Sequence, residues 1–180
     1  MKLLILIGAP AVGKASVGKI IASKTDFKLF HNHMVMDGIM ELFGVGTPPE
    51  NRLSKLVRTE IIKEAAEAGM DLIITYVWDF ASEKGRERVT SFKEIYEAHG
   101  GEVVFVELTA PLDVRIARAE TAERKLMKRH APDATRVAHL ESKFDYTSPR
   151  PFYFEKYHHI DTTAKTTEAV ADEVMKVVSQ

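Results

Sequence analysis

The chain has 180 residues, a formal net charge of −1 and 45% hydrophobic residues, which together predict one globular domain with a buried core. The near-neutral charge argues against nucleic acid or an anionic membrane as a partner, and no stretch approaches the ~20 apolar residues of a membrane span. Because the chain has no cysteine, disulfides and thiolate metal sites are excluded, and we expect a cytoplasmic protein.

The chain starts with a short apolar run that leads directly into a glycine-rich loop. Residues 2–7 (KLLILI) have the composition of a buried strand, and residues 14–24 place apolar side chains at helical spacing. Between them, residues 8–14 (GAPAVGK) have the spacing Gly-x-x-x-x-Gly-Lys of a P-loop, the Walker A motif. The apolar run is shorter than the core of a signal peptide, so we expect no leader.

A strand before this loop and a helix after it are the context that phosphate binding requires. Glycines let the backbone N–H groups turn toward a phosphate chain, the helix N-terminus adds more N–H groups, and Lys14 supplies a positive charge. Ala15 stands where a hydroxyl usually meets magnesium, and Ser16 follows it. A plain glycine turn with a solvated lysine is the alternative. The residues expected to bind ATP are Gly8, Ala11, Val12, Gly13, Lys14, Ala15 and Ser16, with Ser16 also a ligand of Mg2+.

The rest of the chain alternates short apolar runs with longer amphipathic stretches. Strands are predicted at residues 27–30, 71–78, 103–108 and 157–160, and helices at 34–43, 49–68, 82–99, 111–128, 133–144 and 166–178. This alternation predicts an α/β fold with a parallel sheet between helices. Ligands of such sheets bind beyond the carboxyl ends of the strands, so the segments after the strands carry the candidate residues.

The loop resembles that of adenylate kinases, which reads Gly-x-Pro-Gly-x-Gly-Lys-Gly-Thr. In element order, nearly the whole chain is similar to the nucleoside monophosphate kinases and shikimate kinases. Residues 29–33 (LFHNH) and 75–78 (TYVW) look like stretches of uncharacterised bacterial proteins described as shikimate-kinase-like or AAA-family ATPases. The resemblance implies a P-loop NTPase three-layer sandwich with a five-stranded parallel sheet in the order 2-3-1-4-5. It further implies a single domain over residues 1–180, with an acceptor-binding region at 31–60 and a helical lid at 118–136.

The resemblance places the acceptor site after the second strand. Shikimate kinases have Asp-x-Asp there, whereas this chain has His31-Asn32-His33 and no carboxylate before Asp37. Imidazole titrates near neutral pH, so we predict that His33 is the base and that Asn32 contacts the acceptor. Structural hydrogen bonding or surface exposure of the two histidines is the alternative.

Three further residues are assigned to the acceptor side. Arg58 stands where shikimate kinases read an acidic substrate, and a guanidinium binds carboxylate or phosphate through two hydrogen bonds. Asp79 follows the third strand and is expected to hold Mg2+ or to accept the hydroxyl proton, unless it caps a helix. Trp78 is expected to wall the acceptor pocket, and packing in the core is its alternative. For Arg58, the alternative is a solvated arginine on a helix, paired with Glu60 or Glu64.

On the nucleotide side, the resemblance assigns Arg118 to stacking on adenine and Arg124 to clamping the transferred phosphoryl group from the lid. It places Thr163 in the loop that contacts adenine, where a helix cap is the simpler interpretation.

These features predict an ATP-dependent kinase that uses Mg2+ and transfers the γ-phosphoryl group to a small polar or anionic acceptor. A nucleotide-binding protein or an NTPase without kinase activity is the alternative, which Ala15 and the missing acidic pair support. The GTPase motifs Asn-Lys-x-Asp and Asp-x-x-Gly do not occur in the sequence. The sequence does not predict an oligomeric state.

Overall fold

A five-stranded parallel sheet forms the centre of the molecule in the computed structural model, which describes residues 1–121 and 130–179. Its strands are β1 (Lys2–Ile7), β2 (Lys28–Phe30), β3 (Leu72–Tyr76), β4 (Glu102–Thr109) and β5 (Tyr157–Asp161). They lie in the order β2-β3-β1-β4-β5, so the predicted order is confirmed. The central strand β1 pairs with β3 through Leu3 and Leu72 and with β4 through Leu3 and Val103.

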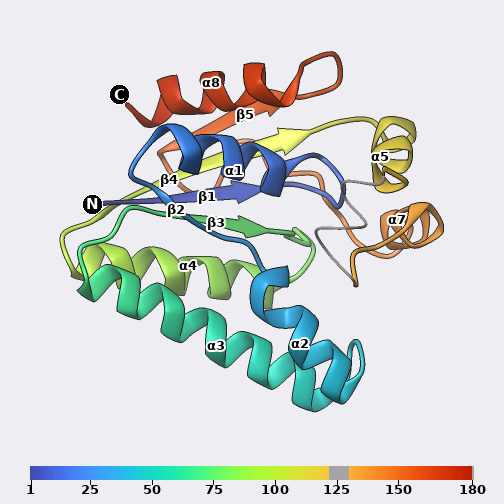
Figure 1. Cartoon of the computed structure of the whole chain (residues 1–180), viewed down its shortest axis with the longest axis horizontal. Coiled ribbons are helices and arrows are strands. Elements are labelled where there is room, and N and C mark those ends of the chain that lie inside the picture. The colour runs from blue at the N-terminus through green and yellow to red at the C-terminus, as the bar shows by residue number, and fades with distance from the viewer. Residues whose placement is uncertain (122–129, 180) are drawn as a thin grey trace.

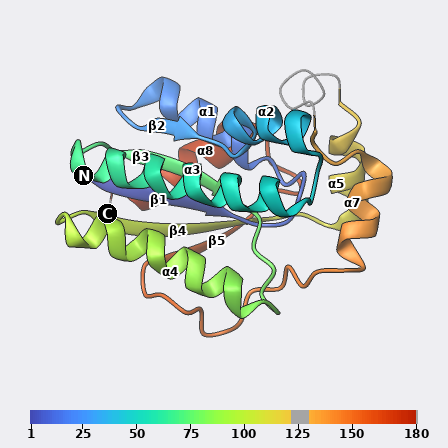
Figure 2. The ribbon, with the colours of Figure 1, turned by 90° about the horizontal axis from the view of Figure 1, so that it is seen from below.

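Helices connect the strands and cover both faces of the sheet. They are α1 (Lys14–Lys24), α2 (His33–Phe43), α3 (Pro48–Glu67), α4 (Glu83–Ala98), α5 (Leu112–Ala119), α7 (Ala134–Glu141) and α8 (Thr167–Val178). Figure 1 shows α1 and α8 above the sheet and α3 and α4 below it. Figure 2, seen from below, shows α3 and α4 lying across the face of the sheet. Together these layers form the expected three-layer sandwich.

The apolar residues of β1 serve both layers of the core. Leu3, Ile5 and Ile7 pack in the cluster that includes residues of α3 and α4. Leu4 and Leu6 pack in the cluster that includes residues of α1 and α8. Because successive side chains point to opposite faces, a strand covered on both sides must be apolar throughout. This is why residues 3–7 form an unbroken apolar run.

The carboxyl ends of the strands gather at one end of the molecule, beside α5 and α7 (Figure 1). β3 ends at Tyr76, two residues before the predicted end, because its partner β1 ends at Ile7 where the glycine-rich loop begins. The helix predicted over 111–128 ends earlier, at Ala119 with Glu120 as its C-cap, and residues 122–129 lie outside the described part of the chain. In the part of the chain that is described, no helix combines the length and apolar character needed to cross a membrane.

Candidate active site

The glycine-rich loop after β1 has a backbone that other residues adopt with difficulty. Gly8 has φ 138° and Gly13 has φ 101°. A Cβ on Gly8 would lie 2.2 Å from the carbonyl oxygen of Leu108 on β4, so the loop packs directly on the neighbouring strand. Ala11 also adopts a left-handed conformation, with φ 67°. The loop therefore curls tightly at the carboxyl end of β1, as a phosphate cradle requires.

Lys14 begins α1 and folds back over this loop. Its Nζ donates hydrogen bonds to the carbonyl oxygens of Gly8 at 2.7 Å and Ala9 at 2.8 Å. The side chain is buried, and it holds its positive charge inside the loop beside the N-terminal end of α1. Both features attract an anion to the same place.

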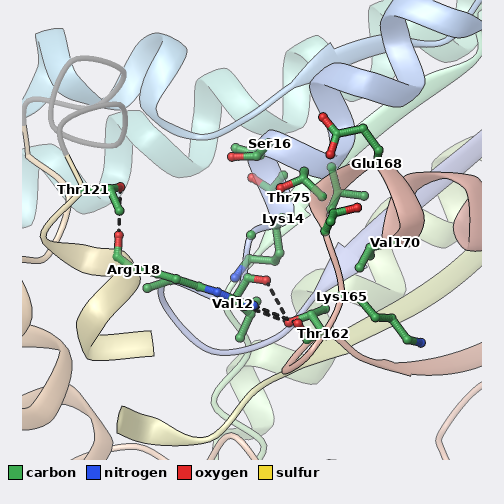
Figure 3. Close-up of a pocket in the computed structure, with 16 residues that line it drawn as sticks. Val12, Lys14, Ser16, Thr75, Arg118, Thr121, Thr162, Lys165, Glu168 and Val170 are labelled. Atoms are coloured by element: carbon green, nitrogen blue, oxygen red, sulfur yellow. Dashed lines mark hydrogen bonds between the residues drawn. The ribbon is translucent and has the colours of Figure 1, made fainter. Parts of the chain in front are cut away.

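A cavity of about 450 Å³ opens beside the loop (Figure 3). Of the loop residues expected to bind ATP, Gly8 does not line this cavity, whereas the others do: Ala11, Val12, Gly13, Lys14, Ala15 and Ser16. The opposite wall comes from α5, the loop after β5 and the start of α8. The lining residues outside the P-loop and α1 are Thr75, Arg118, Thr121, Thr162, Lys165, Thr166, Thr167, Glu168 and Val170.

Arg118 is held at the wall of this cavity by Thr162 (Figure 3). Its Nη1 donates to the Thr162 hydroxyl at 2.8 Å and its Nη2 donates to the Thr162 carbonyl oxygen at 2.7 Å. The Thr162 hydroxyl in turn donates to the carbonyl oxygen of Thr109 at 2.9 Å. The planar guanidinium is thereby fixed in orientation, which is the requirement for stacking on a base.

The structure gives Thr163 a different place from the one expected. Thr163 is exposed, its hydroxyl is bonded to Asp161, and it does not line the cavity. The buried neighbour Thr162 lines the cavity instead, and its hydroxyl donates to the carbonyl oxygen of Thr109.

A second cavity, of about 340 Å³, lies on the other side of the loop. Three of the residues predicted for the acceptor side line it: Asn32, His33 and Asp79. Ala11, Lys14 and Thr75 line both cavities, so the two spaces meet at the P-loop lysine. The remaining lining residues are Pro10, Met36, Met40, Val45, Val77, His130, Pro132, Arg136, Leu140, Phe144 and Tyr146.

His33, which lines the second cavity, is paired with a carboxylate on the same helix. Its Nδ1 lies 2.7 Å from Oδ1 of Asp37, one helical turn further along α2, and both side chains are 18% exposed. When the imidazole is neutral, a proton on Nδ1 faces the carboxylate and Nε2 carries the lone pair. The carboxylate of Asp37 thus fixes the orientation of the imidazole, as in histidines that act as general bases.

Asp79 lines the second cavity and also supports its loop. Its Oδ1 accepts hydrogen bonds from the backbone N–H of Ala81 at 3.2 Å and of Asp145 at 3.1 Å. The carboxylate thus joins the segment after β3 to the segment after α7. One oxygen serves the loop while the side chain remains part of the cavity wall.

Arg58 and Trp78 lie outside both cavities. Arg58 is 6% exposed, and its Nη2 donates to Sδ of Met36 at 3.2 Å while its Cζ lies 5.8 Å from the centroid of the Tyr76 ring. Burial lowers its pKa to about 10. Trp78 is 1% exposed and stacks on Phe80 with ring centroids 4.8 Å apart. The structure therefore places both residues in the core. The face of α3 that carries Arg58 turns away from the two cavities, and so does the side chain of Trp78.

Arg124 lies outside the described residues, so the structure gives no position for it. Of the predicted lid, residues 118–121 and 130–136 are described, and they place Arg118 at the first cavity and His130 and Arg136 at the second.

Solved structures with the same fold include several kinases, all at low sequence identity. A proposed kinase of Chloroflexus aurantiacus is 17% identical with a TM-score of 0.68, and the match covers 99% of this chain and 96% of that one. The APS kinase of Mycobacterium tuberculosis, solved with AMPPNP and APS, is 14% identical with a TM-score of 0.68 over 99% and 98% of the two chains. The shikimate kinase of Acinetobacter baumannii, solved with shikimate, is 16% identical with a TM-score of 0.59 over 98% and 92%.

The chain has the P-loop kinase-like fold. This is the fold that the resemblance to adenylate and shikimate kinases implied. No protein-family model matches the sequence, and no curated protein matches it either.

The residues present fit ATP and magnesium as ligands. The loop offers a curled backbone, a buried lysine and a helix N-terminus to a phosphate chain, and Arg118 is fixed beside the same cavity. Ser16 at the first cavity and Asp79 at the second offer oxygen atoms to Mg2+. Among the described residues no group of three His, Asp or Glu side chains is placed to hold a metal.

Several residues of the site were missed by the sequence analysis. Thr75 and Thr162 are buried threonines whose contact with a cavity depends on the packing of neighbouring strands. Asp37 could have been found, because a His and an Asp four residues apart on a helix face each other. The apolar wall of the second cavity comes from four separate segments, so no local sequence pattern predicts it.

Proposed function

We propose that the protein is an ATP-dependent small-molecule kinase. The observation that carries this proposal is the meeting of two cavities at Lys14, one suited to a nucleotide and the other large enough for a small molecule. A P-loop protein that only binds nucleotide has no need of a second cavity that opens onto the same lysine. The nucleotide complex of the APS kinase neighbour supports ATP as the donor.

The transfer step balances with groups that this chain supplies. The acceptor hydroxyl oxygen forms a bond to the γ-phosphorus, the bond from that phosphorus to the bridging oxygen breaks, and ADP leaves. The hydroxyl proton passes to His33, which Asp37 orients and whose positive charge Asp37 then stabilises. Lys14 follows the charge on the outer phosphates as it shifts toward ADP.

The other assigned residues bind and position the reactants. Arg118 contacts the nucleotide base, Asn32 contacts the acceptor, and Arg124 clamps the transferred phosphoryl group. Ser16 and Asp79 would hold Mg2+, which would neutralise charge on the phosphates. Since kinases accelerate transfer mainly by position and charge, loss of Lys14 should affect the rate most strongly.

The test is ATP consumption with Mg2+ in the presence of a panel of acceptors: shikimate, nucleosides, nucleoside monophosphates, sugars and phenicol-type alcohols. We expect turnover that depends on one acceptor class and falls by about 100-fold or more in Lys14→Ala. Lys19→Ala is the matched control, since Lys19 is exposed on the same helix. ATP binding with hydrolysis that no acceptor changes would refute the kinase and support the NTPase or nucleotide-binding alternative.

A further inference from the structure

The second cavity has mostly apolar walls. Apolar side chains reach it from the P-loop, α2, the segments after α2 and β3, and α7 with the segment that follows it. They are Pro10, Met36, Met40, Val45, Val77, Leu140, Phe144 and the ring of Tyr146. A ligand in this space therefore meets hydrocarbon on several sides, whichever way it is turned.

Some of these side chains are more exposed than large apolar residues usually are. Val45 is 42% exposed, Val77 is 40% and Phe144 is 44%. When a ligand covers exposed apolar groups, their removal from water lowers the free energy of the complex. Exposed apolar side chains gathered around one cavity are therefore typical of binding grooves. The exposure thus indicates a ligand with an apolar surface of its own.

The polar side chains of the cavity are Lys14, Asn32, His33, Thr75, Asp79, His130, Arg136 and the hydroxyl of Tyr146, and several of them suit a hydroxyl. They include the amide of Asn32, the His33 imidazole with its Asp37 partner, and the Asp79 carboxylate. Arg58, the residue expected to read an anionic acceptor, is buried outside the cavity against Met36. The cations on its described wall are Lys14, which is bonded to the P-loop carbonyls, and Arg136, which is exposed on α7.

We propose that the acceptor is an alcohol with an apolar, aromatic or alicyclic body, rather than a polyol or an organic acid. The hydrocarbon lies against the methionine, valine and aromatic walls, and the hydroxyl faces Lys14 where the two cavities meet. A volume of about 340 Å³ limits it to a small molecule. Methionine side chains on α2 adapt their shape to such a body at little cost. This inference rests on the proposed kinase function, since it names the acceptor of the same site.

The test is calorimetric titration of the full chain, with AMPPNP present, using 3-phenylpropane-1,2-diol against glycerol, and cyclohexylmethanol against shikimate. We expect each apolar-bodied alcohol to bind at least tenfold more tightly than its polar counterpart. Met40→Gln should weaken binding of the phenyl diol about tenfold, because the change places a polar amide in the apolar wall. Met34→Gln is the matched control, since Met34 lies on the same helix, is 61% exposed and lines neither cavity.

Val77→Thr gives the same test with an exposed residue and almost unchanged volume, with Val114→Thr on α5 as its control. Tighter binding of glycerol or shikimate than of the apolar alcohols, or equal binding in Met40→Gln and wild type, overturns the inference. The two proposals fail differently. Binding of the phenyl diol, with no phosphoryl transfer to any acceptor of the panel, refutes the kinase and keeps the ligand class. Transfer to shikimate or a sugar, without binding of the diol, refutes the ligand class and keeps the kinase.

Discussion

Gly8→Ala is the substitution whose effect the structure fixes most closely. The new Cβ would lie 2.2 Å from the Leu108 carbonyl oxygen, well inside contact distance, and the backbone has φ 138°, which other residues rarely adopt. Such backbone strain costs about 1–3 kcal/mol, and overpacking against a neighbouring strand costs a similar amount. We therefore expect Gly8→Ala to lower the free energy of unfolding by about 4 kcal/mol.

Gly100→Ala separates the two contributions. Gly100 follows α4 with φ 74°, and a Cβ there meets no atom within 4 Å. Only the backbone term remains, so the expected loss is about 1 kcal/mol. At about 2–4 °C of melting temperature for each kcal/mol, the two variants should differ by roughly 10 °C.

Thermal and urea unfolding measure this difference, and binding of a fluorescent ATP analogue measures its effect on the loop. Binding should weaken at least tenfold in Gly8→Ala, because the P-loop must shift away from β4, and should not change in Gly100→Ala. If the two variants lose equal stability and both bind the analogue normally, the close packing of the loop on β4 is not what fixes its shape, and the reasoning is wrong.

Two further changes test the surroundings of the cavities. Thr162→Val should cost about 1–2 kcal/mol in urea unfolding and weaken nucleotide binding, because Arg118 loses its hydroxyl partner; Thr163→Val, at an exposed position, should change nucleotide binding little, and an equal loss in both variants would contradict the assignment. Burial raises the pKa of Tyr146 to about 12, so the neutral phenol stabilises the folded state below pH 10 and this contribution is lost as the pH rises toward 12. The urea midpoint of Tyr146→Phe should therefore fall less than that of the wild type between pH 8 and pH 11, and an equal fall would contradict the burial of the phenol.

The fold was within reach of the sequence because its signals are local. The unbroken apolar run of residues 3–7 indicates a strand covered on both faces, and the P-loop spacing predicts the turn and the helix that follow it. The sheet order came from the resemblance of this loop and of the element order to adenylate and shikimate kinases, and the structure has that order. The ends of elements were less accurate: β3 ends at Tyr76, opposite the last residue of β1, rather than at the predicted Trp78.

The P-loop residues follow the sequence for the same reason, since Gly8, Gly13 and Lys14 act through their own backbone and side chain within seven consecutive positions. The acceptor cavity could not be predicted in this way, because its walls come from segments distant in sequence and depend on the direction in which each side chain points. Position alone suggested Arg58 and Trp78 as acceptor residues, yet the packing of α3 and of the aromatic core buries both. The sequence by itself predicted a parallel sheet and the P-loop turn between β1 and α1, whereas tertiary structure decided the apolar second cavity, because a wall built from distant segments exists only after they pack.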